Sequence, residues 1–225
     1  TIEPNVGVIT VPDERLDRLA ELVNPEKVQP TTMEIVDIAG LVKGSSKGEG
    51  LGNKFLANIR ETNAIIHVLR CFEDDNIVHV NGSVNPVRDK ETIDFELQIK
   101  DLETIEKKRE KHMKIAKSGN KDAQKIVSSL EKYISHIESG KSARSLNSTD
   151  SDLESIIDLY LLTSKPILYV CNVDENAMKS GNKHVYAVKE VIKDEDAEIL
   201  LIATAIESEI AEIDDFEERQ MFLEE

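Results

Sequence analysis

Residues 34–41 read EIVDIAGL, an apolar strand that ends in Asp37-Ile38-Ala39-Gly40. A carboxylate at the end of such a strand can reach Mg²⁺ through a water molecule, and a glycine there lets a backbone N–H approach a terminal phosphate. Asp-x-x-Gly is short enough to occur by chance. The motif therefore indicates a nucleotide site only together with the strand before it and with a second motif after a later strand.

That second motif lies in residues 168–175, LYVCNVDE, where another apolar strand ends in polar residues. GTP-binding proteins of the P-loop class use Asn-Lys-x-Asp here, and their Asp accepts hydrogen bonds from the guanine N1–H and N2 amine. Asn172 is retained, but Val173 takes the Lys position and Glu175 takes the Asp position. The longer carboxylate does not fit the guanine edge in the same way, and the N1 acceptor of adenine would be repelled by a carboxylate. The motif therefore predicts a base-reading loop without guanine specificity.

Apolar runs alternate with helical patterns along the chain. The better runs are residues 33–38, 64–71, 166–173 and 198–203, and a weaker run at 6–11 is expected at an edge. This alternation predicts an α/β fold with a mostly parallel sheet and helices on both faces. The runs are nearly continuous in Ile, Val and Leu, as in strands that are covered on both sides. Ligands of such sheets bind outside the carboxyl ends of the strands, where Ala203-Thr204-Ala205 follows the last run.

Residues 85–164 have a different character and predict a helical insertion. Apolar residues repeat there with spacings of 4, 3, 4 and 3, the seam of a coiled coil, at Ala123, Val127, Leu130, Ile134 and Ile137. A looser stripe predicts a partner helix through Ile93, Leu97, Leu102, Ile105 and Ile115. Ser118-Gly119-Asn120 predicts the turn of an antiparallel hairpin, and Ser151 with Glu154 predicts the capping box of a third helix. The expected domains are 1–84 and 165–225, the two parts of a nucleotide-binding domain, and 85–164, the insertion, which is either a solvated structural element or a partner-docking arm.

Composition excludes several classes of function. The chain has 28 Lys and Arg against 44 Asp and Glu, a net charge of −16, which disfavours non-specific nucleic-acid binding by the whole surface and leaves room for a local basic patch. No apolar run is long enough for a membrane helix, so no membrane partner is expected. Two cysteines fall short of a disulfide framework and suit a reducing compartment, which predicts a cytoplasmic protein. The first and last residues carry no start or stop signal, and we expect the chain to be cut at both ends.

Taken together, these motifs resemble the YchF or Obg-like ATPase family of translation-factor-related P-loop NTPases. The resemblance is carried by residues 1–5 (TIEPN), 11–16 (VPDERL), 36–43 with 48–56 (VDIAGLVK and GEGLGNKFL), 70–75 (RCFEDD), 172–175 (NVDE) and 207–211 (ESEIA). It covers essentially the whole chain. It implies a nucleotide-binding domain with a coiled-coil insertion, a TGS domain that these residues lack, ATP preferred over GTP, bound Mg²⁺, and association with ribosomes.

The resemblance also implies roles for individual residues. Thr1 falls on the switch threonine that ligates Mg²⁺, Asp37 on the carboxylate of the magnesium shell, and Gly40 on the γ-phosphate amide. Leu41 replaces the glutamine that orients the attacking water, so a potassium ion, a backbone group or a residue in 44–52 is left to position that water. The base-contacting positions are Asn172, Val173, Glu175, Ala203, Thr204 and Ala205.

One family motif is missing from the sequence. The phosphate-binding Gly-x-x-x-x-Gly-Lys-Ser/Thr occurs nowhere in the 225 residues, and in the family it lies upstream of the segment that begins at Thr1. The full-length protein is therefore expected to be an Mg²⁺-dependent ATPase, with weaker GTPase activity, and the chain by itself is expected to be inactive. The alternatives are a nucleotide-incompetent module that acts through its hairpin and a GTPase that prefers GTP.

Overall fold

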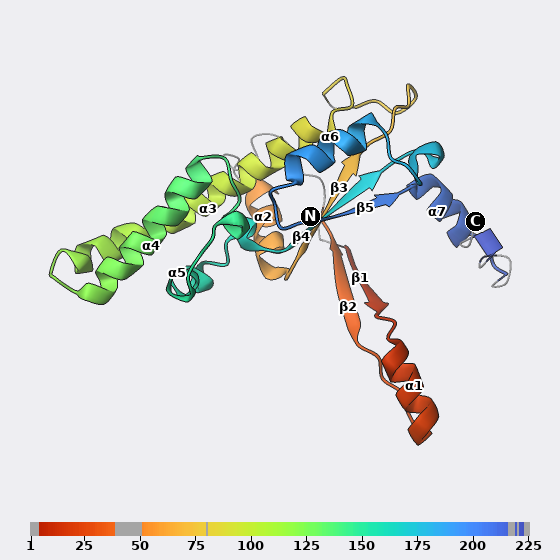
Figure 1. Ribbon diagram of the computed structural model, residues 1–225, viewed down its shortest axis with the longest axis horizontal. Helices are drawn as coiled ribbons and strands as arrows, with labels where there is room; N and C mark the ends of the chain where they lie inside the picture. Colours follow the sequence, from red (N-terminus) through yellow and green to blue (C-terminus); the bar gives the residue numbers. More distant parts are fainter. Residues whose placement is uncertain (1–4, 39–50, 80, 216–218, 220, 223–225) are drawn as a thin grey trace. The chain divides into compact units, whose positions relative to one another are not determined.

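The computed structural model describes residues 5–38, 51–79, 81–215, 219 and 221–222, and for 51–54 it describes the backbone only (Figure 1). The chain divides into two compact units, residues 1–41 and residues 42–225, and each is described by itself. Within the described residues, no helix combines the length and the apolar composition that are needed to cross a bilayer.

The first unit is a two-stranded ribbon with one helix. Strands β1 (Asn5–Thr10) and β2 (Thr32–Asp37) pair antiparallel, and α1 (Glu14–Val23) lies between them in sequence. The strands were predicted correctly to within a residue, but the expectation that residues 33–38 form a parallel strand covered on both sides is wrong. Most side chains of β2 are exposed, and its one strand partner among the described residues is the antiparallel β1.

The second unit contains the predicted parallel sheet. Strands β3 (Ile65–Arg70), β4 (Ile167–Asn172) and β5 (Glu198–Ile202) are parallel in the order β3-β4-β5 (Figure 1). Each strand lies within the apolar run that predicted it, and the α/β fold class is confirmed. The parallel register brings the carboxyl ends of all three strands to the same edge of the sheet.

One face of this sheet carries the core of the unit. Helix α6 (Lys183–Ile192) packs on it through three buried residues, Val185, Val188 and Ile192. The buried strand residues of this cluster are Leu69, Ile167, Tyr169 and Cys171. On the other face Ile66, Val68 and Leu200 are exposed. On the same face Val170, which pairs with Val68 and Leu200 in the register, is buried. Among the described residues this second face is therefore covered only in part, at the central strand β4.

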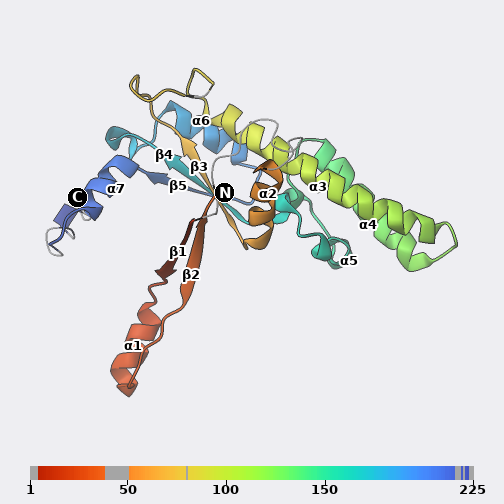
Figure 2. The same cartoon turned by 180° about the vertical axis from the view of Figure 1, so that it is seen from behind.

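The predicted helical hairpin is confirmed. Helices α3 (Pro86–Ala116) and α4 (Lys121–Glu138) run side by side away from the sheet, as the view from behind shows (Figure 2). All five residues of the predicted α4 seam are buried. Asn120 begins α4 by accepting a hydrogen bond from the Ala123 N–H at 2.9 Å. Ile115, assigned to the partner stripe, is exposed, because it lies in the last turn of α3 where the hairpin ends.

The third helix of the insertion is shorter than predicted. Helix α5 (Asp150–Glu154) ends where the predicted capping box had its second residue, and the chain continues in the short 3₁₀ turns η2 (Ile157–Leu159) and η3 (Leu162–Ser164). The observed capping box is formed by Thr149 and Asp152. The helix cannot continue through Tyr160, because that residue has a φ of +47°.

A buried cluster of charges joins the hairpin to the sheet. Glu195, between α6 and β5, accepts hydrogen bonds from Lys90 Nζ at 2.6 Å, from Arg144 at 2.8 Å and from the Tyr169 hydroxyl at 3.0 Å. Lys90 also binds Asp94 at 2.6 Å. Burial opposes ionisation of Glu195, but the hydrogen bonds from Lys90 and Arg144 keep its pKa below the usual value. The cluster therefore connects α3, the turn η1 (Ala143–Ser145), β4 and the segment before β5.

A second buried carboxylate holds the end of the insertion. Asp101 of α3 is fully buried and accepts the backbone N–H groups of Leu162 and Thr163, each at 2.7 Å, together with the Thr163 hydroxyl at 2.7 Å. Thr163 in turn accepts the Ala143 N–H at 3.0 Å. A buried carboxylate is tolerated only where its lone pairs are satisfied. Asp101 thereby sets the path by which the chain returns from the insertion to β4.

Asp152 offers a test of how the insertion is stabilised. It accepts hydrogen bonds from Ser129 at 2.7 Å, Lys132 at 2.9 Å and Thr149 at 2.8 Å, and these bonds hold the pKa of Asp152 well below its usual value. We expect Asp152→Asn to lower the free energy of unfolding by about 1.5–3 kcal/mol at pH 7, and exposed Asp150→Asn to change it by less than about 0.5 kcal/mol.

The measurement is urea unfolding of both variants between pH 3 and 7. Because the folded pKa is lowered, the stabilisation by Asp152 is present above the unfolded pKa of about 4 and is lost as the pH falls below it. The difference between Asp152→Asn and the unsubstituted chain should therefore shrink on acidification. An equal difference at all pH values would contradict this account.

Candidate functional site

The candidate site lies at the carboxyl edge of the parallel sheet. Asn172 is the last residue of β4, and Thr204 opens α7 (Thr204–Ala211) directly after β5. The Asn172 Oδ1 accepts the Thr204 N–H at 3.3 Å and the Thr204 hydroxyl at 3.1 Å. One side chain thus joins two loops that are 32 residues apart in sequence.

Two of the predicted contact residues have buried side chains. Val173 is 4% exposed and Ala203 is 2% exposed, and Val173 belongs to the core of the sheet. The Val173 N–H donates to the Ile202 carbonyl at 2.8 Å, which continues the pairing of β4 with β5. A ligand contact at these two positions is therefore left to the backbone. The sequence did not indicate this, because strand residues at a sheet edge look alike whether they face the core or the solvent.

The polar groups available at this edge are Glu175, Thr204 and Asn172. Glu175 is exposed in the 3₁₀ turn η4 (Glu175–Ala177), and Thr204 and Ala205 are exposed at the start of α7. The turn η4 is held by Asp174, whose Oδ1 accepts the Ala177 N–H at 3.2 Å. Sequence reasoning gave Asp174 no role, although an Asp three residues before a turn amide is a typical capping arrangement.

The loop after β3 is tied to the same edge through α6. Asn182 caps α6 by accepting the N–H groups of His184 and Val185, and its Nδ2 donates to the Cys71 carbonyl at 2.7 Å. Glu73 lies 2.9 Å from His184 Nε2 and 3.2 Å from Lys183 Nζ. These contacts hold the pKa of Glu73 below its usual value, with the His184 hydrogen bond as the larger cause. Asn182 is a positioning residue that sequence reasoning missed.

Both cysteines lie beneath this edge. Cys71 and Cys171 are free and fully buried, in agreement with the absence of a disulfide framework. The hydrogen bond with Cys171, together with burial, raises the pKa of the Cys71 thiol above its usual value. Cys71 therefore stays protonated and packs as a small apolar residue.

The predicted phosphate and magnesium residues fall in the other unit. Asp37 is exposed at the end of β2, whereas Thr1, Gly40 and Leu41 lie outside the described residues. Among the described residues, no group of three or more His, Cys, Asp or Glu side chains is arranged to hold a metal. Mg²⁺ commonly takes only one or two carboxylates and completes its shell with phosphate and water, so a single exposed Asp37 fits the predicted role.

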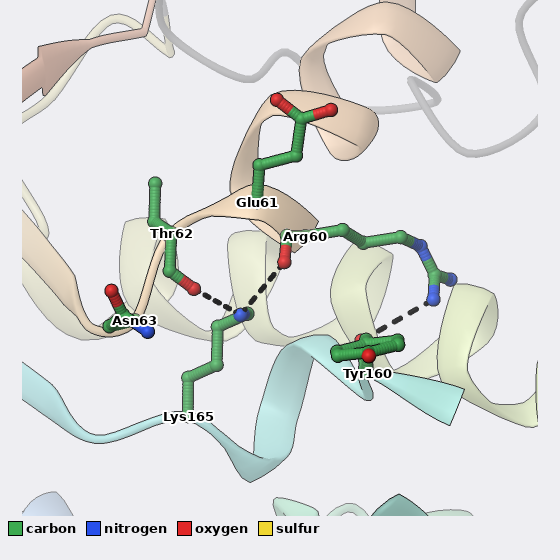
Figure 3. A pocket seen from close by; sticks show the side chains of 6 residues that line it. All are labelled: Arg60, Glu61, Thr62, Asn63, Tyr160 and Lys165. Carbon is green, nitrogen blue, oxygen red and sulfur yellow. Dashed lines mark hydrogen bonds between the residues drawn. The ribbon is translucent and has the colours of Figure 1, made fainter. Parts of the chain in front are cut away.

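A pocket of about 440 Å³ lies at the opposite edge of the sheet (Figure 3). It is lined by Arg60, Glu61, Thr62, Asn63, Tyr160 and Lys165. Lys165 Nζ donates to the carbonyls of Arg60, at 3.1 Å, and Thr62, so it holds the end of α2 (Leu51–Glu61). The Arg60 guanidinium donates to the Leu159 carbonyl at 3.0 Å. Both cations thus hold backbone carbonyls of the fold. The residues that line the pocket lie at the amino ends of β3 and β4, whereas the candidate site lies at the carboxyl ends of the strands.

The bridge made by Asn172 can be tested without a ligand. Because Asn172→Ala removes the acceptor of two Thr204 hydrogen bonds at an exposed position, we expect a stability loss of about 1 kcal/mol or less. The Thr204 amide should exchange with deuterium about fivefold faster or more, since its bond now opens locally. Asn176→Ala, an exposed neighbour in η4, is the matched control and should leave the exchange unchanged. Equal exchange in both variants would show that the bridge does not hold the loop.

Comparison with known proteins identifies the family of the chain. Residues 1–117 match the family described as 50S ribosome-binding GTPase. The "Ribosome-binding ATPase YchF" of Bacillus subtilis is 53% identical over 227 residues, which is 100% of this chain and 62% of that protein. The protein of the same name from Escherichia coli O157:H7 is 49% identical over 225 residues, 100% of this chain and 61% of that protein.

A solved structure is similar as well. The chain matches the "Structure of the Schizosaccharomyces pombe YchF GTPase" with a TM-score of 0.82 and 35% identity, over 98% of this chain and 61% of that one. The chain spans about three fifths of the length of these relatives. The family match, the sequence identities and the structural similarity agree, and the chain therefore belongs to the 50S ribosome-binding GTPase family, among its YchF members.

Proposed function

We propose that this chain forms part of a ribosome-associated P-loop nucleoside triphosphatase that binds its purine base at the carboxyl edge of the β3-β4-β5 sheet. The observation that carries the proposal is the Asn172 side chain, which holds the Thr204 loop beside the Asn172–Glu175 segment. This arrangement offers the exposed Thr204 hydroxyl and backbone groups to the edge of a base. The names of the relatives support the association with ribosomes.

The preferred base in this proposal is adenine. A guanine reader needs a carboxylate held at a short distance from the N1–H and N2 donors, and the chain offers the longer Glu175 instead. Val173 replaces the usual lysine and is buried, so its side chain does not cover the base. ATP is therefore the proposed substrate, and GTP the weaker one.

The remaining parts of the site are proposed from the motifs. Asp37, with Thr1, would hold Mg²⁺, which neutralises charge on the phosphates during transfer. Gly40 would offer its N–H to the γ-phosphate, and apolar Leu41 leaves the attacking water to K⁺, a backbone group or residues 44–52. The three-part division at residues 84 and 164 and a cytoplasmic location belong to the same proposal.

A second candidate is favoured by one observation on the sequence. The 225 residues contain no Gly-x-x-x-x-Gly-Lys motif, so the chain by itself is either nucleotide-incompetent or a weak binder, and its hairpin would then be the functional part. The two candidates differ in whether triphosphate binding is restored when such a segment is supplied.

The base preference is tested by calorimetric titration with Mg·ATP and Mg·GTP, using the chain extended before Thr1 by a phosphate-binding strand and loop. We expect ATP to bind more tightly, because Glu175 replaces the guanine-reading Asp. Glu175→Asp should narrow the preference, and Glu190→Asp on the exposed side of α6 should not. Tenfold tighter binding of GTP, about 1.4 kcal/mol in the opposite direction, would overturn the proposed base preference.

The role of the missing loop is tested by comparing the 225-residue chain with the extended one. Most of the affinity for a triphosphate in this class comes from P-loop amides and a lysine around the β-phosphate. An overall charge of −16 provides no general attraction to replace them. We expect ATP to bind the 225-residue chain at least about a hundredfold more weakly. Micromolar binding by both would mean that the phosphates are held elsewhere.

A further inference from the structure

The closed end of the α3–α4 hairpin is strongly basic in an acidic protein. Residues 107–125 contain eight Lys and Arg and two acidic residues, Glu110 and Asp122, a local net charge of +6. Since the whole chain carries −16, the other residues together carry −22. Residues 107–125 thus form a local excess of positive charge, which we call the basic hairpin end.

The lysines of this end are exposed and have no ion-pair partner among the described residues. The exposed ones are Lys107, Lys111, Lys114, Lys117, Lys121 and Lys125. Lys108 is the exception, because it binds Asp158 and the Ser155 carbonyl and so belongs to the fold. Helical spacing places Lys107, Lys111 and Lys114 on the side of α3 away from α4, and Lys121 and Lys125 on the outer side of α4. The charge therefore surrounds the end of the hairpin.

Helix stability does not explain these lysines. Lys114 and Lys117 lie at the carboxyl end of α3, where the helix dipole favours cations. Lys121 is the first residue of α4, where the dipole disfavours them. The pairs Lys107–Lys111 and Lys121–Lys125 also place like charges four residues apart, which costs about 0.2–0.5 kcal/mol each. Because these lysines repel one another, binding of an anionic partner at this surface would relieve the repulsion.

The basic hairpin end is also pre-organised and remote from the sheet. Gly119 takes the left-handed conformation of the turn at a φ of +88°, Asn120 caps α4, and Gln124 donates to the Ala116 carbonyl at 3.4 Å. At 1.5 Å per residue, the 31 residues of α3 span about 46 Å. Figure 2 shows the hairpin end on the far side of the second unit from β5. A fixed, distant, cationic end loses little conformational entropy when it binds.

We propose that the basic hairpin end binds the phosphate backbone of structured RNA. Residues 107–125 contain no aromatic side chain that stacks on a base, so the contacts are to phosphates and carry little sequence preference. The acidic remainder repels RNA elsewhere, which directs RNA to this one end. The inference rests on the proposed ribosome association and deepens it, because it assigns the contact to ribosomal RNA and to one end of the insertion.

The test compares two triple variants that remove the same charge. K111Q/K121Q/K125Q neutralises the basic hairpin end, and K27Q/K141Q/K189Q neutralises three exposed lysines outside it. Binding of each full 225-residue chain to purified large ribosomal subunits is measured between about 50 and 300 mM KCl. Circular dichroism and thermal unfolding verify that both variants keep the helical content of the unsubstituted chain.

We expect the hairpin-end variant to bind at least tenfold more weakly at about 100 mM salt, and the control variant to change by less than threefold. The slope of log K against log salt is negative, and its magnitude should decrease by about two to three in the hairpin-end variant. Each lost phosphate contact lowers that magnitude by about 0.7–0.9. Equal binding by the two variants would overturn the inference and leave ribosome association standing. A loss of affinity without a change of slope would indicate a ribosomal protein as the partner and would also overturn it.

A second probe separates this inference from the proposed function. If the unsubstituted chain does not bind the subunits, its association with ribosomes is contradicted, and a short RNA duplex is titrated in the same salt series. Salt-dependent binding that the hairpin-end variant loses and the control keeps would still support the inference. Absence of duplex binding, or equal binding by both variants, would overturn it.

Discussion

The partly buried carboxylate of Glu195 is the contact on which the arrangement of the second unit depends. It accepts hydrogen bonds from Lys90 of α3, Arg144 of the insertion and Tyr169 of β4, and so brings three separate segments to one place. A buried charge is tolerated only when it is paired and fully hydrogen-bonded, which makes removal of any one partner costly for the others. The cluster therefore connects the hairpin to the sheet.

The Glu195 cluster lies between two parts of the second unit, the carboxyl edge of the sheet and the helical hairpin. Asp101 completes it by holding the turn that leads back into β4, so the sheet resumes in register after an insertion of about 80 residues. The carboxyl edge of the sheet is then free to position Asn172 and Thr204, while the hairpin extends away with its own apolar seam.

Few side chains of the candidate site are exposed to solvent. Asn172 is engaged with Thr204, and Val173 and Ala203 pack inward. What remains exposed is the Glu175 carboxylate and the start of α7. Specificity at such an edge depends on which backbone groups the packing leaves open, and Asn182 and Asp174 contribute by holding the neighbouring loops in place.

The sequence by itself determined the local elements and the family. Continuous apolar runs located β3, β4 and β5 to within one or two residues, and the spacing of Ala123 to Ile137 located the seam of α4, because these patterns depend on neighbours along the chain. Several stretches along the chain, among them those around Asp37 and Asn172, carried the resemblance to the family, which the comparisons confirm.

Only the tertiary structure decided how these elements are used. It paired β2 antiparallel with β1, ended α5 at Glu154, turned Val173 inward, and gathered Lys90, Arg144 and Glu195 from positions more than 50 residues apart. Pairing direction, burial and ion pairing all depend on residues that are distant in sequence. No local pattern carries that information, because a strand or a charge has the same sequence signature whether its eventual partner is water, a helix or another charge.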